Sequence, residues 1–403
     1  MDLPSAENAY LFRHAVVRDA AYGLQPPSER AVLHGLALDI LESVSGLNRA
    51  ALGLELARHA RMAHEGGHEV ERFIMAERRL LRTGGDYARF NYDYRGALEA
   101  FERLHGMLKD DPPERAIVAD MLADVLQRLG RYADSLTCFE EVRAHAENKE
   151  MVGRALVHLA WVGLEMGRDV DALIEEGEAL AESTDSHRLR IAFMMLRAHR
   201  KSFAGDHKGA AAEMGTVIDY ARRTNDLVQV LVGHGNAARY FTEAGDLEAA
   251  NAHLDAAEAM CQQPTLKHHL ANLVRARAQT AIHAGDYESA LRYAREAAGM
   301  GVTTGGRGLY ADSLCEVAVA LTGLGEYPEA FDTLQEVRPI IAETGDVPLA
   351  TAWLRAYAAL MRAWDKGSQA VPVLEESLLE LEGRAPAQTL KALREELAEL
   401  RGS

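Results

Sequence analysis

Small apolar residues recur along this chain at a nearly constant interval, and each recurrence follows a short polar turn. The clearest unit is "HAGDYESALRYAREA", residues 283–297, where a Gly-Asp turn precedes a helical stretch. The units align on one position, which we call the anchor and which is occupied by Ala97, Ser135, Ala172, Ala210, Ala250, Ala290, Ala330 and Ala370. Successive anchors are 38, 37, 38, 40, 40, 40 and 40 residues apart. A fixed period in this range is typical of a solenoid of stacked units.

A second column of small residues lies twelve residues before each of these anchors. Its members are all alanine or glycine: Gly85, Ala123, Ala160, Ala198, Ala238, Ala278, Ala318 and Ala358. Two small positions per unit predict a pair of antiparallel helices whose backbones approach closely. A large side chain at either position would overpack the pair, at a cost of about 1 to 3 kcal/mol.

The polar turns carry signals for the end of one helix and the start of the next. A glycine suits a left-handed helix terminus because it has no Cβ, which predicts that role for Gly130, Gly167, Gly205, Gly245, Gly285 and Gly325. The aspartates that follow three of them, Asp206, Asp246 and Asp286, are placed to cap the second helix. No strand-like alternation competes with this pattern, so the sequence predicts an all-α protein.

Composition narrows the function classes. The formal net charge is -17, from 61 acidic and 44 basic residues, which disfavours a direct nucleic-acid partner because phosphate binding requires a positive surface. The N-terminus lacks a signal-peptide pattern and the chain lacks a long apolar run, so we expect a cytoplasmic protein without a membrane span. The three cysteines are far apart, which indicates reduced, buried thiols: Cys138, Cys261 and Cys315.

The columns resemble the tetratricopeptide repeat (TPR), which has a small residue on its first helix, a Gly-Asp-Tyr-type turn and an early alanine on its second. The turn tyrosine is present at Tyr132, Tyr287 and Tyr327. The period is longer than the family's, and the closing proline is mostly missing, which implies longer helices or junctions. The resemblance implies a right-handed superhelical solenoid of about eight TPR-like helix-turn-helix repeats over residues 78–384, with a C-terminal capping helix over 385–403.

Residues 1–77 carry a different signal. The stretch "YLFRHAVVRDAAYGLQPPSERAVLHGLALDILE", residues 10–42, resembles the segment after the ATPase core in bacterial signal-transduction ATPases of the STAND class. The matching residues are Phe12, His14, Arg18, Ala21, Tyr22, Arg30, Leu33 and His34. The phosphate-binding motif G-x-x-x-x-G-K-[ST] is absent from the sequence, so the resemblance implies the sensor arm of such a protein without its ATPase, and no cofactor.

In TPR arrays the first helices line a concave groove in which peptides or helices bind. The corresponding positions predict a partner-binding groove made of Arg154, Trp161, His199, Arg239, Asn272, Arg275, Gln279, His283, Asp312, Arg355 and Arg362. Acidic residues also occur there: Asp120, Asp124, Glu165 and Glu243. The arginines could clasp an acidic peptide or a small anionic effector, or they could pair with acids of the neighbouring helix. Trp161 could belong to the core or to the groove.

One short motif suggests a metal site. "HEGGH", His64 to His68, matches the H-E-x-x-H pattern of zinc hydrolases, with His59 as a third candidate ligand. That chemistry requires both histidines on a regular helix, whereas two adjacent glycines favour a solvated turn. The turn is the preferred interpretation, and we expect no metal and no catalytic residues.

The most glycine-rich stretch is "GMGVTTGGRG", residues 299–308. It could wrap an anion with backbone amides, but it lacks the ending of a phosphate loop. A flexible connection between two repeats is the expected structure.

These observations favour a non-catalytic recognition protein that binds a protein, a peptide or an anionic effector, as the sensor arm of a STAND-type regulator. The first alternative is a free-standing TPR adaptor or scaffold, with self-association as a possible property. The second, from a different class, is a zinc hydrolase that uses His64, Glu65 and His68.

Overall fold

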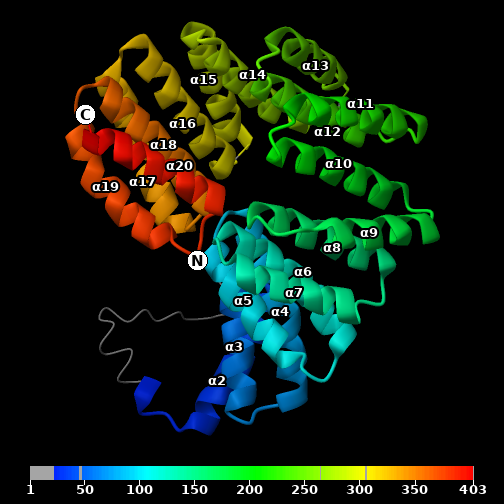
Figure 1. Cartoon of the computed structure of the whole chain (residues 1–403). Helices are drawn as coiled ribbons and strands as arrows, with labels where there is room; N and C mark the ends of the chain where they lie inside the picture. The colour runs from blue at the N-terminus through cyan, green and yellow to red at the C-terminus, as the bar shows by residue number, and fades with distance from the viewer. Residues whose placement is uncertain (1–21, 45–47, 264, 305, 403) are drawn as a thin grey trace. The chain divides into compact units, whose positions relative to one another are not determined.

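The computed structural model describes residues 22–44, 48–263, 265–304 and 306–402, which divide into two compact units, Met1–Val125 and Leu126–Ser403. Within this described part no β-strand occurs (Figure 1). The first unit contains α2 (Pro27–Ser43), α3 (Gly53–Glu65), α4 (Val70–Phe90), α5 (Tyr94–Met107) and most of α6 (Pro112–Arg128).

The second unit begins within the last turn of α6. It continues with α7 (Tyr132–His145), α8 (Lys149–Glu165), α9 (Asp171–Ser183), α10 (His187–Phe203), α11 (His207–Arg223), α12 (Leu227–Glu243), α13 (Leu247–Met260), the 3₁₀ helix η1 (Lys267–His269), α14 (Leu270–Ala284), α15 (Tyr287–Thr304), α16 (Arg307–Leu324), α17 (Tyr327–Thr344), α18 (Val347–Ala363), α19 (Gly367–Leu381) and α20 (Ala387–Gly402).

The helices follow one another as hairpins (Figure 1). Over the described residues, eight helix-turn-helix units run from α4–α5 to α18–α19, as the sequence period predicts, and α20 follows them. From α8 to α20 the first helices of successive units also contact one another: α8 with α10, α10 with α12, and so on to α18 with α20. The predicted TPR-like helical repeat array is therefore confirmed, and most first helices have 17 or 18 residues.

The column of small residues on the first helices is buried throughout. Its seven alanines are at most 1% exposed, and a Cβ added to Gly85 would lie 2.6 Å from the ring of Phe101. These positions are the points where helices approach most closely, which explains the absence of large side chains.

One anchor of the second column was assigned wrongly. Ala172 is exposed, and the buried position at the start of α9 is occupied by Ile174. The cause is the turn after Gly167, which is longer than in the other repeats because Arg168, Asp169 and Val170 precede the helix. The other seven anchors are fully buried.

The turn chemistry matches the prediction. All six glycines have positive φ, between 70° and 84°. The side chains of Asp206, Asp246 and Asp286 accept hydrogen bonds from the backbone N–H three residues later, at 2.8 to 3.1 Å. Each turn thus ends one helix and caps the next.

The glycine-rich stretch 299–308 differs from the expected flexible connection. α15 continues through Thr304, so only the residues after it connect to α16. A Cβ added to Gly301 would lie 2.8 Å from the backbone nitrogen of Tyr310. This glycine therefore permits close packing of α15 against α16, and the stretch is mostly helical.

All three cysteines lie within the described residues and are buried, and no two of them form a disulfide. A search of the described helices finds none with the length and hydropathy that crossing a lipid bilayer would require.

Half of the residues that carry the STAND resemblance can be placed. Phe12, His14, Arg18 and Ala21 lie outside the described residues. The hydroxyl of Tyr22 lies 2.9 Å from Nε2 of His34, and the guanidinium of Arg30 lies 5.0 Å from the centre of the Tyr22 ring. Leu33 is exposed on α2.

Candidate binding groove

One repeat position forms a continuous row across the first helices of the second unit. It directly follows the small-residue column and is occupied by Trp161, His199, Arg239, Gln279, Val319 and Ala359. Because the first helices of successive repeats pack side by side, residues at equivalent positions lie next to one another. All six line one of two pockets, which share Arg239 and Glu243 and together form what we call the groove.

The aromatic pocket is the N-terminal part of the groove and has a volume of about 610 Å³. Its lining comes from α8, α10 and α12, with His207 at the start of α11: Trp161, Glu165, His199, Ser202, Phe203, His207, Asn236, Arg239 and Glu243. Trp161 is 36% exposed, so this side chain belongs to the groove surface rather than to the core.

Trp161 is held by one face of its ring and by its ring nitrogen. Its ring stacks on His199 with centroids 3.6 Å apart and an angle of 20° between the planes. Its Nε1 donates a hydrogen bond of 3.1 Å to Glu165 Oε1. Burial raises the pKa of Glu165, although the hydrogen bond from Trp161 opposes that rise. The indole is thus a preorganised apolar surface with a fixed orientation.

His199 is an uncharged part of this surface. Its Nδ1 lies 2.7 Å from the hydroxyl of Tyr240 and 3.4 Å from Nη2 of Arg239. Because arginine can only donate, Nδ1 must accept and carries no proton. Burial, reinforced by the charge of Arg239, lowers the pKa of His199 to about 3. The imidazole is therefore neutral at physiological pH.

The charged pocket is the C-terminal part of the groove and has a volume of about 560 Å³. Its apolar lining includes Ala276, Val319 and Ala356. Its ionisable side chains come from α12, α14, α16, α18 and α20: Arg239, Glu243, Arg275, His283, Asp312, Glu316, Arg355 and Glu396.

Two helices supply the central charges of this pocket. Nη1 of Arg275 on α14 lies 3.4 Å from Asp312 Oδ2 and also 3.4 Å from Glu316 Oε1, both on α16. Nε2 of Gln279 donates a hydrogen bond of 2.6 Å to the same Glu316 oxygen. One arginine therefore serves two carboxylates, and Asp312 and Glu316 are four residues apart on one helix face.

Burial dominates the electrostatics of these acids. It raises the pKa of Glu316 to about 8, with Arg275 and Gln279 opposing the rise. It also raises the pKa of Asp312, again against Arg275. Burial raises the pKa of Glu396 on α20 as well, with Arg355 and Arg362 opposing. The pocket thus holds carboxyl groups that its own cations neutralise incompletely.

The structure brings together eight of the eleven residues of the predicted partner-binding groove. Trp161, His199 and Arg239 line the aromatic pocket, and Arg239, Arg275, Gln279, His283, Asp312 and Arg355 line the charged pocket. Asn272 on α14 and Arg362 on α18 line neither of them.

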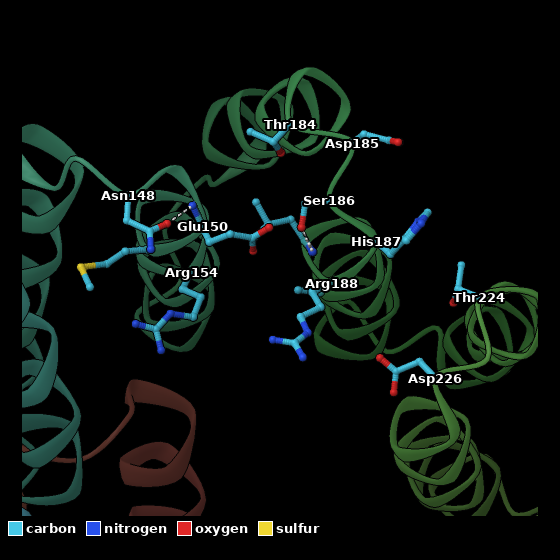
Figure 2. A pocket seen from close by; sticks show the side chains of 13 residues that line it. Asn148, Glu150, Arg154, Thr184, Asp185, Ser186, His187, Arg188, Thr224 and Asp226 are labelled. Carbon is cyan, nitrogen blue, oxygen red and sulfur yellow. Dashed lines mark hydrogen bonds between the residues drawn. The ribbon is translucent and has the colours of Figure 1, made fainter.

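The remaining predicted residue, Arg154, lies at a separate site along the N-terminal ends of α8, α10 and α12. Figure 2 shows it beside Arg188, which comes from α10. The helix-capping side chains Asn148 and Ser186 line the same pocket and bond to backbone N–H groups of their own helices. These caps occupy backbone N–H groups at the helix ends that a ligand could otherwise bind.

Three arginines of the predicted groove have acidic partners, and two of the three pair with an acid of a neighbouring helix, as one of the two interpretations required. Arg275 contacts Asp312 and Glu316 of the neighbouring first helix, and Arg362 contacts Glu399 of α20 at 2.5 Å. Arg239 contacts Glu243 on its own helix at 3.2 Å. The groove is therefore mixed in charge rather than basic.

Two acids of the charged pocket, Glu316 and Glu396, escaped the sequence prediction. Glu316 stands at a repeat position that the neighbouring repeats fill with Ala276 and Ala356, so a break in that apolar column was the available signal. Glu396 belongs to α20, which follows the last repeat, so the repeat alignment assigns no position to it.

The metal alternative fails on geometry. α3 ends at Glu65, and Gly67 has a φ of 87°, so His64 and His68 do not share a helix; the predicted turn is confirmed. His64 Nε2 lies 2.6 Å from Glu77 Oε2, and Glu65 pairs with Arg103. His59, the third candidate ligand, lies with Nδ1 2.9 Å from Nδ1 of His34. In the described part of the chain, no three His, Cys, Asp or Glu side chains are grouped to hold a metal ion.

Comparison with models of known protein families finds no match, and comparison with curated proteins finds none. Solved structures of similar architecture do exist. Aspartyl phosphate phosphatase F from Bacillus subtilis is 12% identical, with a TM-score of 0.50 over 83% of this chain and 96% of that one. A STAND protein with a tetratricopeptide repeat sensor from Pyrococcus horikoshii is 13% identical, with a TM-score of 0.49 over 94% of this chain and 68% of that one.

At 12% identity, the similarity to aspartyl phosphate phosphatase F concerns the fold alone. It agrees with the hairpin architecture described above: this chain shares a helical repeat fold with a solved structure along nearly that structure's whole length.

Proposed function

We propose that this protein is a non-catalytic recognition module that binds a peptide segment of another protein along the groove. The carrying observation is the continuous row from Trp161 to Val319, in which one repeat position lines both pockets. A repeat array offers an extended surface of this kind, and an extended or helical peptide can contact several repeats at once.

The chemistry of the groove supports a ligand with apolar and charged parts. Trp161 and Phe203 supply aromatic surface for an apolar side chain, because rigid aromatic groups give large contact areas at low entropic cost. The polar groups of the charged pocket would then fix the register of the bound segment.

The sign of the ligand's charge is a finer part of the proposal. An acidic peptide or anionic effector, expected from the arginines, would have to compete with Glu243 for Arg239 and with Asp312 and Glu316 for Arg275. Arg355 is exposed in the charged pocket and is the best remaining anion contact. We therefore favour a ligand that carries both signs over a purely anionic one.

The test is selection from a library of random peptides displayed on phage, with the purified chain immobilised. Selected peptides are then titrated against the wild type, Trp161→Ala and Arg239→Glu, with Glu288→Gln as control because Glu288 is exposed on α15 and lines neither pocket. We expect each groove variant to weaken binding by about tenfold or more. Failure to enrich any peptide, or enriched peptides that bind both groove variants normally, would refute the proposal.

A narrower form of the proposal makes this chain the sensor arm of a STAND-type signalling regulator. Its support is the resemblance of residues 10–42 and the TPR-like array that follows. The alternative is a TPR adaptor that acts without an ATPase on the same polypeptide. An antibody raised against this chain distinguishes them in source cells: a band much larger than 44.1 kDa supports the sensor arm, and a band at 44.1 kDa supports the adaptor.

A further inference from the structure

Glu316 is an unusual residue for the interior of a helical array. It lies in the middle of α16, lines the charged pocket and is only 9% exposed. Its Oε1 accepts a hydrogen bond from Gln279 and faces Arg275. Its Oε2 is buried and has no hydrogen-bond partner among the described residues. A buried acceptor without a partner is costly, and such groups are rare unless a ligand satisfies them.

The surroundings of this oxygen are short of positive charge. Arg275 is shared between Glu316 and Asp312, at 3.4 Å from each. Glu396 enters the same pocket from α20, and its Oε2 is also buried without a partner in the described part of the chain. Its contact with Arg362 is long, at 3.8 Å. Three carboxyl groups thus line one pocket, and among the described residues Arg275 contacts two of them, Asp312 and Glu316.

Burial raises the pKa of each of these three carboxyl groups. In each case burial outweighs the nearby arginines, which are Arg275 and Arg128 for Asp312, Arg275 for Glu316, and Arg355 and Arg362 for Glu396. The other ionisable residues that line the pocket are Arg239, Glu243, His283, Cys315 and Arg355.

We propose that the charged pocket binds a cationic group with several N–H donors, a guanidinium or an alkylammonium, placed against Oε2 of Glu316 and beside Asp312, in the pocket that Glu396 also lines. A guanidinium suits the site because it presents several N–H groups in a plane and can bond to two carboxylates at once. This inference deepens the proposed function and rests on it where the cation is a side chain of the bound peptide; a free small cation is the other source of the same chemistry.

The experiment uses the full chain and two kinds of probe. The first is argininamide, with citrullinamide as its uncharged counterpart of nearly equal shape. The second is each groove-dependent peptide from the phage selection, synthesised with its arginines or lysines intact and with each replaced by citrulline. Both are titrated against the wild type, Glu316→Gln and the control Glu288→Gln by calorimetry or by NMR shift changes.

We expect the charged probe to bind the wild type about tenfold or more tightly than its neutral counterpart, since a charge-assisted hydrogen bond is lost. Glu316→Gln should abolish most of that preference, whereas Glu288→Gln should retain it. Circular dichroism is used to check that both variants fold. If Glu316→Gln does not fold, Asp312→Asn gives a second test of the same pocket. Equal binding of charged and neutral probes, or a preference that survives the pocket variants, would overturn the inference.

The two probes also separate the sources and the two proposals. A preference shown by peptides identifies a basic side chain as the ligand group, and one shown only by argininamide identifies a small cation. Groove-dependent peptides without any basic residue, combined with no preference for argininamide, would overturn the cation site and leave peptide recognition intact. A Glu316-dependent preference for argininamide without groove-dependent peptides would do the reverse.

Discussion

His199 and Tyr240, on the first helices of successive repeats, are joined by a hydrogen bond of 2.7 Å between Nδ1 and the phenolic oxygen. The bond links two repeats at the aromatic pocket, and the contact of the same nitrogen with Arg239 favours a neutral imidazole. Trp161 stacks on this imidazole.

The first prediction concerns acid stability. The pKa of His199 is about 3 in the folded chain, below its unfolded value near 6.5, so its contribution to stability is present above pH 6.5 and is lost as the pH falls toward 3. Glutamine at this position does not titrate. Between pH 6.5 and 5, the free energy of unfolding of the wild type should therefore fall by roughly 1 to 2 kcal/mol more than that of His199→Gln. Urea unfolding followed by circular dichroism measures the difference, and parallel pH profiles would contradict it.

The second prediction uses one substitution at two glycines. Gly245 has a φ of 77°, and a Cβ there would contact nothing, so Gly245→Ala should destabilise by about 1 kcal/mol through the backbone alone. Gly215 lies inside α11 with equally open space, and there the same change should stabilise by about 0.5 to 1 kcal/mol. Thermal unfolding of both variants gives the signs; shifts in the same direction would show that the turn assignment is wrong.

The third prediction tests the small-residue column. Ala278 is fully buried where α14 meets its neighbours, so Ala278→Leu should destabilise by about 1 to 3 kcal/mol through overpacking. Ala284 lies on the same helix and is exposed, so Ala284→Leu should change stability by less than about 0.5 kcal/mol. The two denaturation midpoints are compared directly, and equal effects would remove the packing explanation for the column.

The fourth prediction concerns the charged pocket without ligand. The pKa of Glu316 is raised to about 8 in the folded chain, so the stability it contributes is present below its unfolded value near 4.5 and is lost as the pH rises through 8. Glu316→Gln should be more stable than the wild type at pH 8, by about 1 kcal/mol or more, because a buried charge is removed while Arg275 retains Asp312. Greater stability of the wild type at pH 8 would show that the Arg275 pair stabilises the ionised group.

The sequence was sufficient to predict the repeat fold because the features that define it are local and periodic. The turn glycines, the capping aspartates and the small residue of each first helix recur at a fixed distance, so each repeat supports the assignment of the next. The exception is Ala172, where a longer turn after Gly167 moved the buried position to Ile174 without disturbing the first helices.

The charge balance of the groove could not be predicted in the same way. The repeat alignment places Arg239 and Arg275 on the groove. Their acidic partners, however, depend on which side chains of the adjacent helices extend to these arginines. Glu316 and Asp312 neutralise Arg275 from the next repeat. Glu396 reaches the pocket from α20, which the repeat period does not cover.

The most direct test of peptide recognition is a crystal structure of the chain bound to a groove-dependent peptide from the phage selection. We expect the peptide to lie along the groove, with an apolar side chain on Trp161 and polar contacts at Arg239 and Glu316. A peptide bound on the second helices of the repeats, with both pockets empty, would contradict it.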